Sequence, residues 1–345
     1  MASLPWHQEA LSGLIARRER MPHALLLTGR EGFGKVEFAR ALAQSMLCEQ
    51  PAQGGLACGA CPACGWFAEG NHPDYREVLP DSMVEDDAEV EADGTTKSAD
   101  AKPEKKSAQI TIEQIRNLQQ FITLSTHRAG WRVLVLHPAE AMNPQAANAL
   151  LKTLEEPTAN TLMLLVTDQA GRLMPTVRSR CQVVTVPGCE PEVAERWLLD
   201  QGLDARIARD ALAQAGGAPL LALAWSEDTW QESRRQVLAA LAAPERADWL
   251  QLAGLLEKSD LKAVLLWVHT WCCDLVLQQQ TGAVRHHPDF AKDAARIAGQ
   301  ATAHALFRFE NELRQLRRHI QHPLNARLWL ENLLLSYSLA VKAAD

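Results

Sequence analysis

The feature that most constrains this fold is a glycine-rich segment at residues 29–36, which reads GREGFGKV. Phosphate-binding loops follow the pattern G-x-x-x-x-G-K-[S/T], and Gly29, Gly34 and Lys35 fall at its spacing. An apolar run at 24–28 precedes the segment, and a helical pattern follows it. Strand, glycine loop and helix in this order are the context that such a loop requires. The segment therefore predicts the first strand-loop-helix unit of an α/β domain.

The loop lacks the hydroxyl that normally ligates Mg²⁺, because Val36 stands at that position. A second Mg²⁺ ligand in loop-type ATPases is an Asp at the end of a later strand, yet the predicted strand 132–136 runs into His137 and Pro138. Mg²⁺ prefers oxygen ligands, so we favour the interpretation that His137 has no metal role over the alternative that it is a metal ligand. Glu140 comes too late to match a catalytic base. Two missing metal ligands argue against ATP hydrolysis by this chain.

The rest of the chain predicts an α/β domain followed by helices. Short apolar runs alternate with helical patterns, which is typical of a parallel sheet covered on both faces. The predicted strands are 24–28, 132–136 and 161–166, and the predicted helices are 6–20, 35–47, 111–125 and 143–156. From about residue 190 the pattern is helical to the end, with joints near 187–188, 216–219 and 226–228. A length of 345 residues predicts two or three domains.

Charge is concentrated in one segment. The net charge is −7, and residues 81–101 alone account for it, with eight acidic residues against one lysine. The remainder is close to neutral, which excludes a broadly basic DNA-coating protein. Residues 81–108 are poor in apolar side chains, so we expect a disordered surface insertion, with a functional acidic segment as the alternative. We expect a cytoplasmic location and no membrane span, because no apolar run reaches about 20 residues and residues 1–21 do not resemble a secretory signal.

Four cysteines form a compact sequence cluster with the spacing C-x9-C-x2-C-x2-C: Cys48, Cys58, Cys61 and Cys64. This spacing predicts a tetrahedral zinc site, which is structural because four protein ligands leave no open position. An iron–sulfur cluster and metal-free thiols are also compatible with it, whereas disulfides are disfavoured in a reducing compartment. The remaining cysteines lack such spacing and are predicted to be packing residues: Cys181, Cys189, Cys272 and Cys273.

Several segments together resemble one known family: residues 23–29 leading into the loop, the cysteine cluster, 72–75 (HPDY), 148–157 (NALLKTLEEP), 173–181 (LMPTVRSRC) and 325–334 (NARLWLENLL). Over nearly the whole chain except the acidic insertion, the sequence is similar to delta-prime subunits of bacterial DNA polymerase III clamp loaders, within the AAA+ superfamily. The resemblance implies an α/β AAA+ core over 1–187, with a parallel sheet, flanking helices, the zinc module and the insertion at about 81–108. A small helical lid over 188–228 and an all-α collar over 229–345 would follow.

The resemblance also implies roles for single residues. Arg180, in a Ser-Arg-Cys triplet, would act in trans as an arginine finger on the ATP of a neighbouring subunit. By residue type alone a salt-bridged surface arginine is the alternative, and Arg178 is a second candidate for the finger. Thr167 matches a polar sensor position and is expected to be vestigial. The lid arginine of many AAA+ proteins is absent from 216–219, a third missing part of the ATP site.

The function implied by the resemblance is that of a non-hydrolysing clamp-loader subunit within the DNA-directed DNA polymerase holoenzyme. It would assemble with delta and gamma/tau subunits in a five-membered ring that loads the sliding clamp on primed DNA. Gly29, Gly34 and Lys35 would be inherited framework, with ATP not bound or not hydrolysed. One alternative is an ATP-hydrolysing motor of the gamma/tau type. Another is a subunit that binds nucleotide without hydrolysis, because loop amides at a helix N-terminus still attract phosphate.

Overall fold

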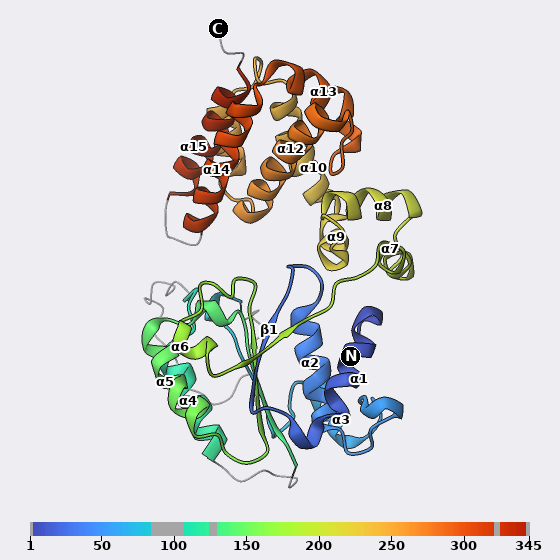
Figure 1. Ribbon diagram of the computed structural model, residues 1–345, viewed down its shortest axis with the longest axis vertical. Helices are drawn as coiled ribbons and strands as arrows, with labels where there is room; N and C mark the ends of the chain where they lie inside the picture. Colours follow the sequence, from blue (N-terminus) through green and yellow to red (C-terminus); the bar gives the residue numbers. More distant parts are fainter. Residues whose placement is uncertain (1–2, 84–106, 124–129, 321–324, 343–345) are drawn as a thin grey trace, which may run out of the picture. The chain divides into compact units, whose positions relative to one another are not determined.

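The structure is a computed structural model that describes residues 3–83, 107–123, 130–320 and 325–342. Most of the predicted insertion at 81–108 lies outside the described residues. The chain divides into two compact units, Met1–Glu190 and Pro191–Asp345 (Figure 1). The predicted further division of the second unit, into a lid and a collar at residue 228, stays a prediction.

A five-stranded parallel sheet forms the centre of the first unit, with the order β2-β3-β4-β1-β5. Its strands are β1 Ala24–Thr28, β2 Tyr75–Val78, β3 Arg132–Leu136, β4 Thr161–Val166 and β5 Gln182–Thr185. The sequence predicted β1, β3 and β4, which are almost wholly buried and read as continuous apolar runs. The two edge strands were not predicted, because β2 is only partly buried and β5 is largely exposed.

Helices cover both faces of this sheet, as predicted (Figure 1). Successive side chains of a strand point to opposite faces. Leu25 and Leu27 accordingly pack with Phe38 of α2, whereas Leu26 packs with Leu150 of α5. The helical segments of the unit are η1 Pro5–His7, α1 Gln8–Ile15, η2 Arg18–Arg20, α2 Lys35–Leu47, η3 Gln53–Gly55, α3 Pro62–Ala68, η4 Asp81–Met83, α4 Ile112–Thr123, η5 Ala139–Ala141, α5 Pro144–Glu155 and α6 Pro175–Arg178.

The second unit is helical throughout its described residues, as predicted. Its segments are α7 Pro191–Asp200, α8 Ala205–Gln214, α9 Pro219–Trp225, α10 Asp228–Ala242, α11 Trp249–Leu256, α12 Leu261–Thr281, η6 Pro288–Phe290, α13 Ala291–Gln300, α14 Ala303–His319 and α15 Ala326–Val341. Helices α7, α8 and α9 pack on one another, and α10 to α15 share one apolar core.

Helix α12 is the central element of that core. Among the described residues it is the one helix long and apolar enough to cross a membrane by length and composition. More than half of its apolar window is buried inside the protein, and Trp267 and Trp271 are fully buried there. Trp271 Nε1 donates a hydrogen bond to Tyr337 Oη over 2.8 Å, and Tyr337 Oη donates to the Leu241 carbonyl over 2.7 Å. Core packing therefore accounts for the apolar character of α12.

Candidate functional site

The predicted phosphate loop connects the end of β1 to the start of α2, as its sequence context requires. Gly34 directly precedes the helix with φ +87°, a left-handed conformation that side chains disfavour. A Cβ on Gly34 would also lie 2.4 Å from Leu4 Cδ1 and 3.0 Å from His7 Cε1. Glycine is therefore needed at this position for two reasons, the backbone turn and the close approach of the N-terminal segment.

The N-terminal segment holds the loop through the carbonyl of Phe33. Trp6 Nε1 donates to this oxygen over 3.0 Å, and His7 Nε2 lies 2.9 Å from the same atom. Burial lowers the pKa of His7 to about 4, so the ring is neutral at pH 7 and Nε2 carries the donated proton. Phe33 itself is buried. Trp6 and His7 of η1 thus hold the loop in place through the Phe33 carbonyl.

Lys35, the lysine of the loop pattern, is paired within the chain. Its Nζ lies 2.5 Å from Asp168 Oδ1 and donates to the Arg30 carbonyl over 2.7 Å, and only 5% of its side chain is exposed. Asp168 follows β4, the neighbour of β1, and was not predicted as a site residue. The signal that could have found it is its place directly after Thr167, since parallel strands end at one edge of a sheet. The charge that would meet a phosphate is already compensated by a carboxylate.

The second Mg²⁺ position is occupied by a hydrogen-bonded network around Glu77 of β2. His137 Nε2 lies 2.6 Å from Glu77 Oε1, Arg40 Nη2 donates to the same oxygen over 2.7 Å, and Tyr75 Oη donates to Oε2 over 2.9 Å. Burial alone would raise the pKa of Glu77, but the bonds from His137 and Arg40 outweigh it and lower the pKa to about 2. His137 therefore has a protein partner, which favours the interpretation without a metal role.

Two further residues lie at the same edge of the sheet. Glu140, in η5, accepts a hydrogen bond from the backbone N–H of Asp168 over 3.2 Å, and its Oε2 is buried without a hydrogen-bond partner. Thr167 Oγ1 accepts from the N–H of Gln169 over 3.1 Å, so the predicted sensor residue bonds locally. The fold brings Lys35, Asp168 and Glu140 together, whereas Val36 packs against the apolar core.

Arg180 lies on the surface just after α6 and is held by two contacts. Its Nη2 lies 2.6 Å from Glu155 Oε1 at the end of α5, and its Nη1 donates to the Thr176 carbonyl over 3.0 Å. More than a third of its side chain is exposed, and Arg178 is exposed as well. A surface ion pair of this kind contributes about 1 kcal/mol or less, so the guanidinium can exchange partners at small cost. The finger role of Arg180 stays a prediction.

The four predicted metal ligands converge between α2 and α3. Their Sγ atoms all lie within 4.8 Å of one another, with Cys48 to Cys58 at 3.6 Å and Cys48 to Cys61 at 3.8 Å. Four thiolates about 2.3 Å from a tetrahedral zinc would be about 3.8 Å apart. The N–H groups of Ala60 and Cys61 donate to Cys58 Sγ and lower the pKa of that thiol. The donor set and its spacing therefore fit a tetrahedral metal ion.

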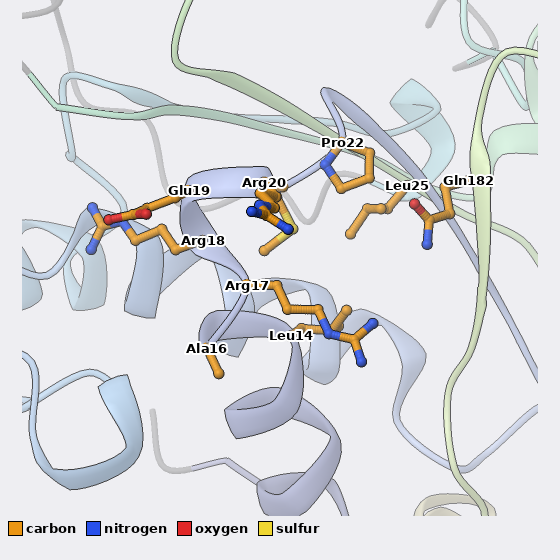
Figure 2. Close-up of a pocket in the computed structure, with 10 residues that line it drawn as sticks. Leu14, Ala16, Arg17, Arg18, Glu19, Arg20, Pro22, Leu25 and Gln182 are labelled. Carbon is orange, nitrogen blue, oxygen red and sulfur yellow. The ribbon is translucent and has the colours of Figure 1, made fainter.

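A separate hollow, shown in Figure 2, lies at the opposite end of β1. Leu25 and Gln182 near the starts of the parallel strands β1 and β5 line it, together with residues of 14–22. Arginines at 17, 18 and 20 surround this hollow, and Arg18 Nη2 donates to the Met46 carbonyl over 2.8 Å. The phosphate loop follows the other end of β1, so this hollow is not part of the candidate nucleotide site.

The fold and the site define a class of protein: a parallel α/β unit with a phosphate loop after a central strand, followed by a helical unit. The family described as "DNA polymerase III, delta subunit" matches residues 8–190, and "DNA polymerase III, delta subunit, C terminal" matches residues 227–338. The chain belongs to this DNA polymerase III delta-subunit family, and the resemblance predicted from its motifs is confirmed.

Curated relatives define the particular subunit type. DNA polymerase III subunit delta' of Pseudomonas aeruginosa is 35% identical over 277 residues, which are 79% of this chain and 76% of the relative. The subunit delta' of Escherichia coli K12 is 29% identical over 340 residues, covering 96% and 94%. The subunit tau of Salmonella typhimurium is 30% identical over 162 residues, covering 47% and 21%. A solved DNA polymerase III gamma subunit-related protein from Thermotoga maritima aligns with a TM-score of 0.47 at 17% identity, covering 97% and 100%.

Proposed function

We propose that this chain is a non-hydrolysing subunit of the bacterial clamp loader, a component of the DNA polymerase III holoenzyme in the cytoplasm. It would assemble with delta and gamma/tau subunits to load the sliding clamp on primer-template DNA. Similarity to delta' subunits over most of the chain supports the assembly. The observation that best supports the absence of ATP hydrolysis is the pairing of Lys35 with Asp168 and with the Arg30 carbonyl.

Phosphoryl transfer in loop-type ATPases depends on positioning and on compensating charge, which the loop lysine and Mg²⁺ supply. To serve a nucleotide here, Lys35 would first have to leave Asp168. Val36 offers no oxygen to a metal, and His137 is bonded to Glu77. Each of these differences removes charge compensation that phosphoryl transfer requires, whereas the N–H groups of the loop can still attract phosphate. ATP is therefore either not bound or bound without hydrolysis.

The cysteine cluster would hold a structural zinc ion that joins the end of α2 to the start of α3. Cys48 directly follows α2, and Cys61 directly precedes α3. A bound zinc would link these helix ends and the Cys58 loop through four thiolates. With four protein ligands the ion has no position for substrate, so its contribution is to stability of the first unit.

The second unit would supply the lid and the collar of the ring subunit. The mutual packing of α7, α8 and α9 supports a lid over 188–228, and the shared core of α10 to α15 supports a collar over 229–345. Arg180 would then be the chain's contribution to chemistry, donated to the ATP of a neighbouring gamma/tau subunit. The exposure of Arg180 and its weak ion pair with Glu155 support this role.

An ATPase comparison tests the proposal. The purified chain should co-purify with delta and gamma/tau subunits, and alone it should show no Mg²⁺-dependent ATP turnover above that of its Lys35→Ala variant. The reason is that the wild-type lysine is already bound to Asp168 and that both metal positions lack ligands.

Robust turnover by the isolated wild-type chain, abolished by Lys35→Ala, would establish the motor alternative instead. Equilibrium binding of ATP to the wild-type chain and to Lys35→Ala tests the third possibility, which is nucleotide binding without hydrolysis. Failure to co-purify with the delta and gamma/tau subunits would count against the clamp-loader assignment itself.

A further inference from the structure

A second group of metal-ligating side chains lies in the helical unit, away from the four-cysteine cluster. His269 and Cys273 are one turn apart on α12, so they share a face, and Glu310 projects from α14. Their ligand atoms all lie within 4.8 Å of one another. His269 Nε2 is 3.3 Å from Glu310 Oε1, and Cys273 Sγ is 4.0 Å from His269 Nε2.

These distances approach those around a tetrahedral zinc ion. Zinc lies about 2.0 Å from His nitrogen and carboxylate oxygen and about 2.3 Å from thiolate sulfur, so ligand N and O are about 3.3 Å apart and S and N about 3.6 Å. The nitrogen-to-oxygen distance already matches, and the sulfur is about 0.4 Å farther from the nitrogen than a bound zinc ion requires. The three ligand atoms are therefore near the separations that one zinc ion requires.

One oxygen of the Glu310 carboxylate has no hydrogen-bond partner. Its Oε2 is buried and has no hydrogen-bond partner, although 17% of the whole side chain is exposed. Its Oε1 is shared between His269 and Arg314 Nε, which donates over 3.2 Å. Arg314 is 69% exposed, so it neutralises the carboxylate only weakly. A bound cation would compensate both oxygens, and an uncompensated buried oxygen is otherwise costly.

Cys272, which precedes Cys273 on α12, has the surroundings of a packing cysteine. Cys272 is 1% exposed and lies 3.8 Å from the Leu306 carbonyl in the apolar core. Cys273 is partly exposed and lies beside His269, which gives it a metal-ligating neighbour. The prediction that Cys273 is a packing residue rests on its sequence spacing alone, and the structure places a metal-ligating side chain beside it. A donor set of thiolate, imidazole and carboxylate suits zinc, whereas Mg²⁺ and Ca²⁺ take oxygen ligands.

We propose that His269, Cys273 and Glu310 bind a zinc-class divalent cation that links α12 to α14. Binding releases the Cys273 thiol proton to solvent, and the hydrogen that His269 Nε2 donates to Glu310 moves to Nδ1 as the imidazole changes tautomer. The thiolate and Nε2 then coordinate the ion. Three protein ligands leave a fourth position for water or for a side chain of another molecule. This site is independent of the proposed clamp-loader function and of the four-cysteine cluster.

Site-resolved alkylation of the full chain tests the proposal. With the four-cysteine cluster saturated, added Zn²⁺ should slow iodoacetamide modification of Cys273 by about tenfold or more, because a thiolate bound to the ion is not free to attack the reagent. Cys189 is the internal control, because it lies in the other unit and is partly exposed like Cys273. Mass spectrometry of the peptides gives both rates.

The variants His269→Ala and Glu310→Gln should abolish the protection, whereas matched changes on α14, His304→Ala and Glu312→Gln, should keep it. Arg314→Gln should strengthen it, because that change removes the competing cation. Elemental analysis should find one zinc equivalent more in the wild type than in Cys273→Ser. An unchanged Cys273 rate with Zn²⁺, measured on the wild-type chain, overturns the proposal whether or not any variant folds. Protection that persists in folded His269→Ala and Glu310→Gln overturns it as well.

Discussion

At the scale of single residues, a sequence pattern specifies a side chain but not its partner. Lys35 stands at the pattern position of a phosphate-binding lysine, yet its ammonium pairs with Asp168. His137 stands where a metal-ligating acid is expected, yet it bonds to Glu77. In both cases a carboxylate on a neighbouring strand or just beyond the end of one decides what the side chain does. The degenerate loop is therefore best understood through its contacts.

The network around Glu77 predicts a pH dependence of stability. Its folded-state pKa of about 2 lies below the ordinary value of 4.5, so its contribution is complete above pH about 4.5 and is lost as the pH falls toward about 2. The contribution is on the order of 2 kcal/mol of unfolding free energy. Urea unfolding of the wild type and of Glu77→Gln should differ by this amount at pH 7 and converge near pH 2.

Glu113→Gln is a suitable control, because Glu113 is exposed on α4 and takes no part in the hydrogen bonds described around Glu77. A wild-type advantage over Glu77→Gln that stays constant from pH 7 to pH 2 would contradict the assignment of the low pKa to this carboxylate.

At the scale of elements, α2 connects the two features that the sequence made most conspicuous. It begins at Lys35, directly after the left-handed Gly34, and it ends at Leu47, directly before Cys48. One face packs on the sheet through residues such as Phe38 and Leu42. The loop and the cysteine cluster thus lie at the two ends of one largely buried helix.

Loss of a single thiolate should disturb the end of α2 that carries the cluster. Cys64→Ser should release zinc and raise amide hydrogen exchange over residues 48–68, because three remaining ligands hold the ion less tightly than four. Elemental analysis and exchange measured by mass spectrometry check the two effects. Cys189→Ser, outside the cluster, should keep both the metal and the protection. Wild-type protein prepared in the presence of zinc but free of it would rule out the metal site.

At the scale of the whole molecule, the chain offers a sheet unit with an exposed arginine and a helical unit with its own large core. The sheet unit holds Lys35 internally while Arg180 remains at its surface. In this proposed role the chain would provide charge to another subunit's nucleotide while its own loop stays closed. Interfaces, more than its own site, would then define its contribution to the assembly.

Arg180→Ala should leave the stability of the isolated chain nearly unchanged, because the lost ion pair with Glu155 is exposed. In the assembled loader it should lower turnover at the one adjacent ATP site by about a thousandfold, the lower range for an arginine finger. The total rate of DNA-stimulated ATP hydrolysis should fall by the fraction that this one site contributes to it. Arg178→Ala is the matched comparison and should retain the rate. Equal rates for the wild-type and Arg180→Ala loaders would reject the finger role.

The sequence by itself determined the features that depend on short stretches of chain. Buried strands read as apolar runs, the loop has fixed spacing, and cysteines at the metal spacing lie within 17 residues of one another. Tertiary structure decided the features that join distant residues. The edge strands β2 and β5, the pairing of Lys35 with Asp168, and the grouping of Cys273 with Glu310 belong to this class. The physical reason is that propensity and periodicity are local, whereas the partner of a charged or metal-ligating group is set by which elements the fold packs together.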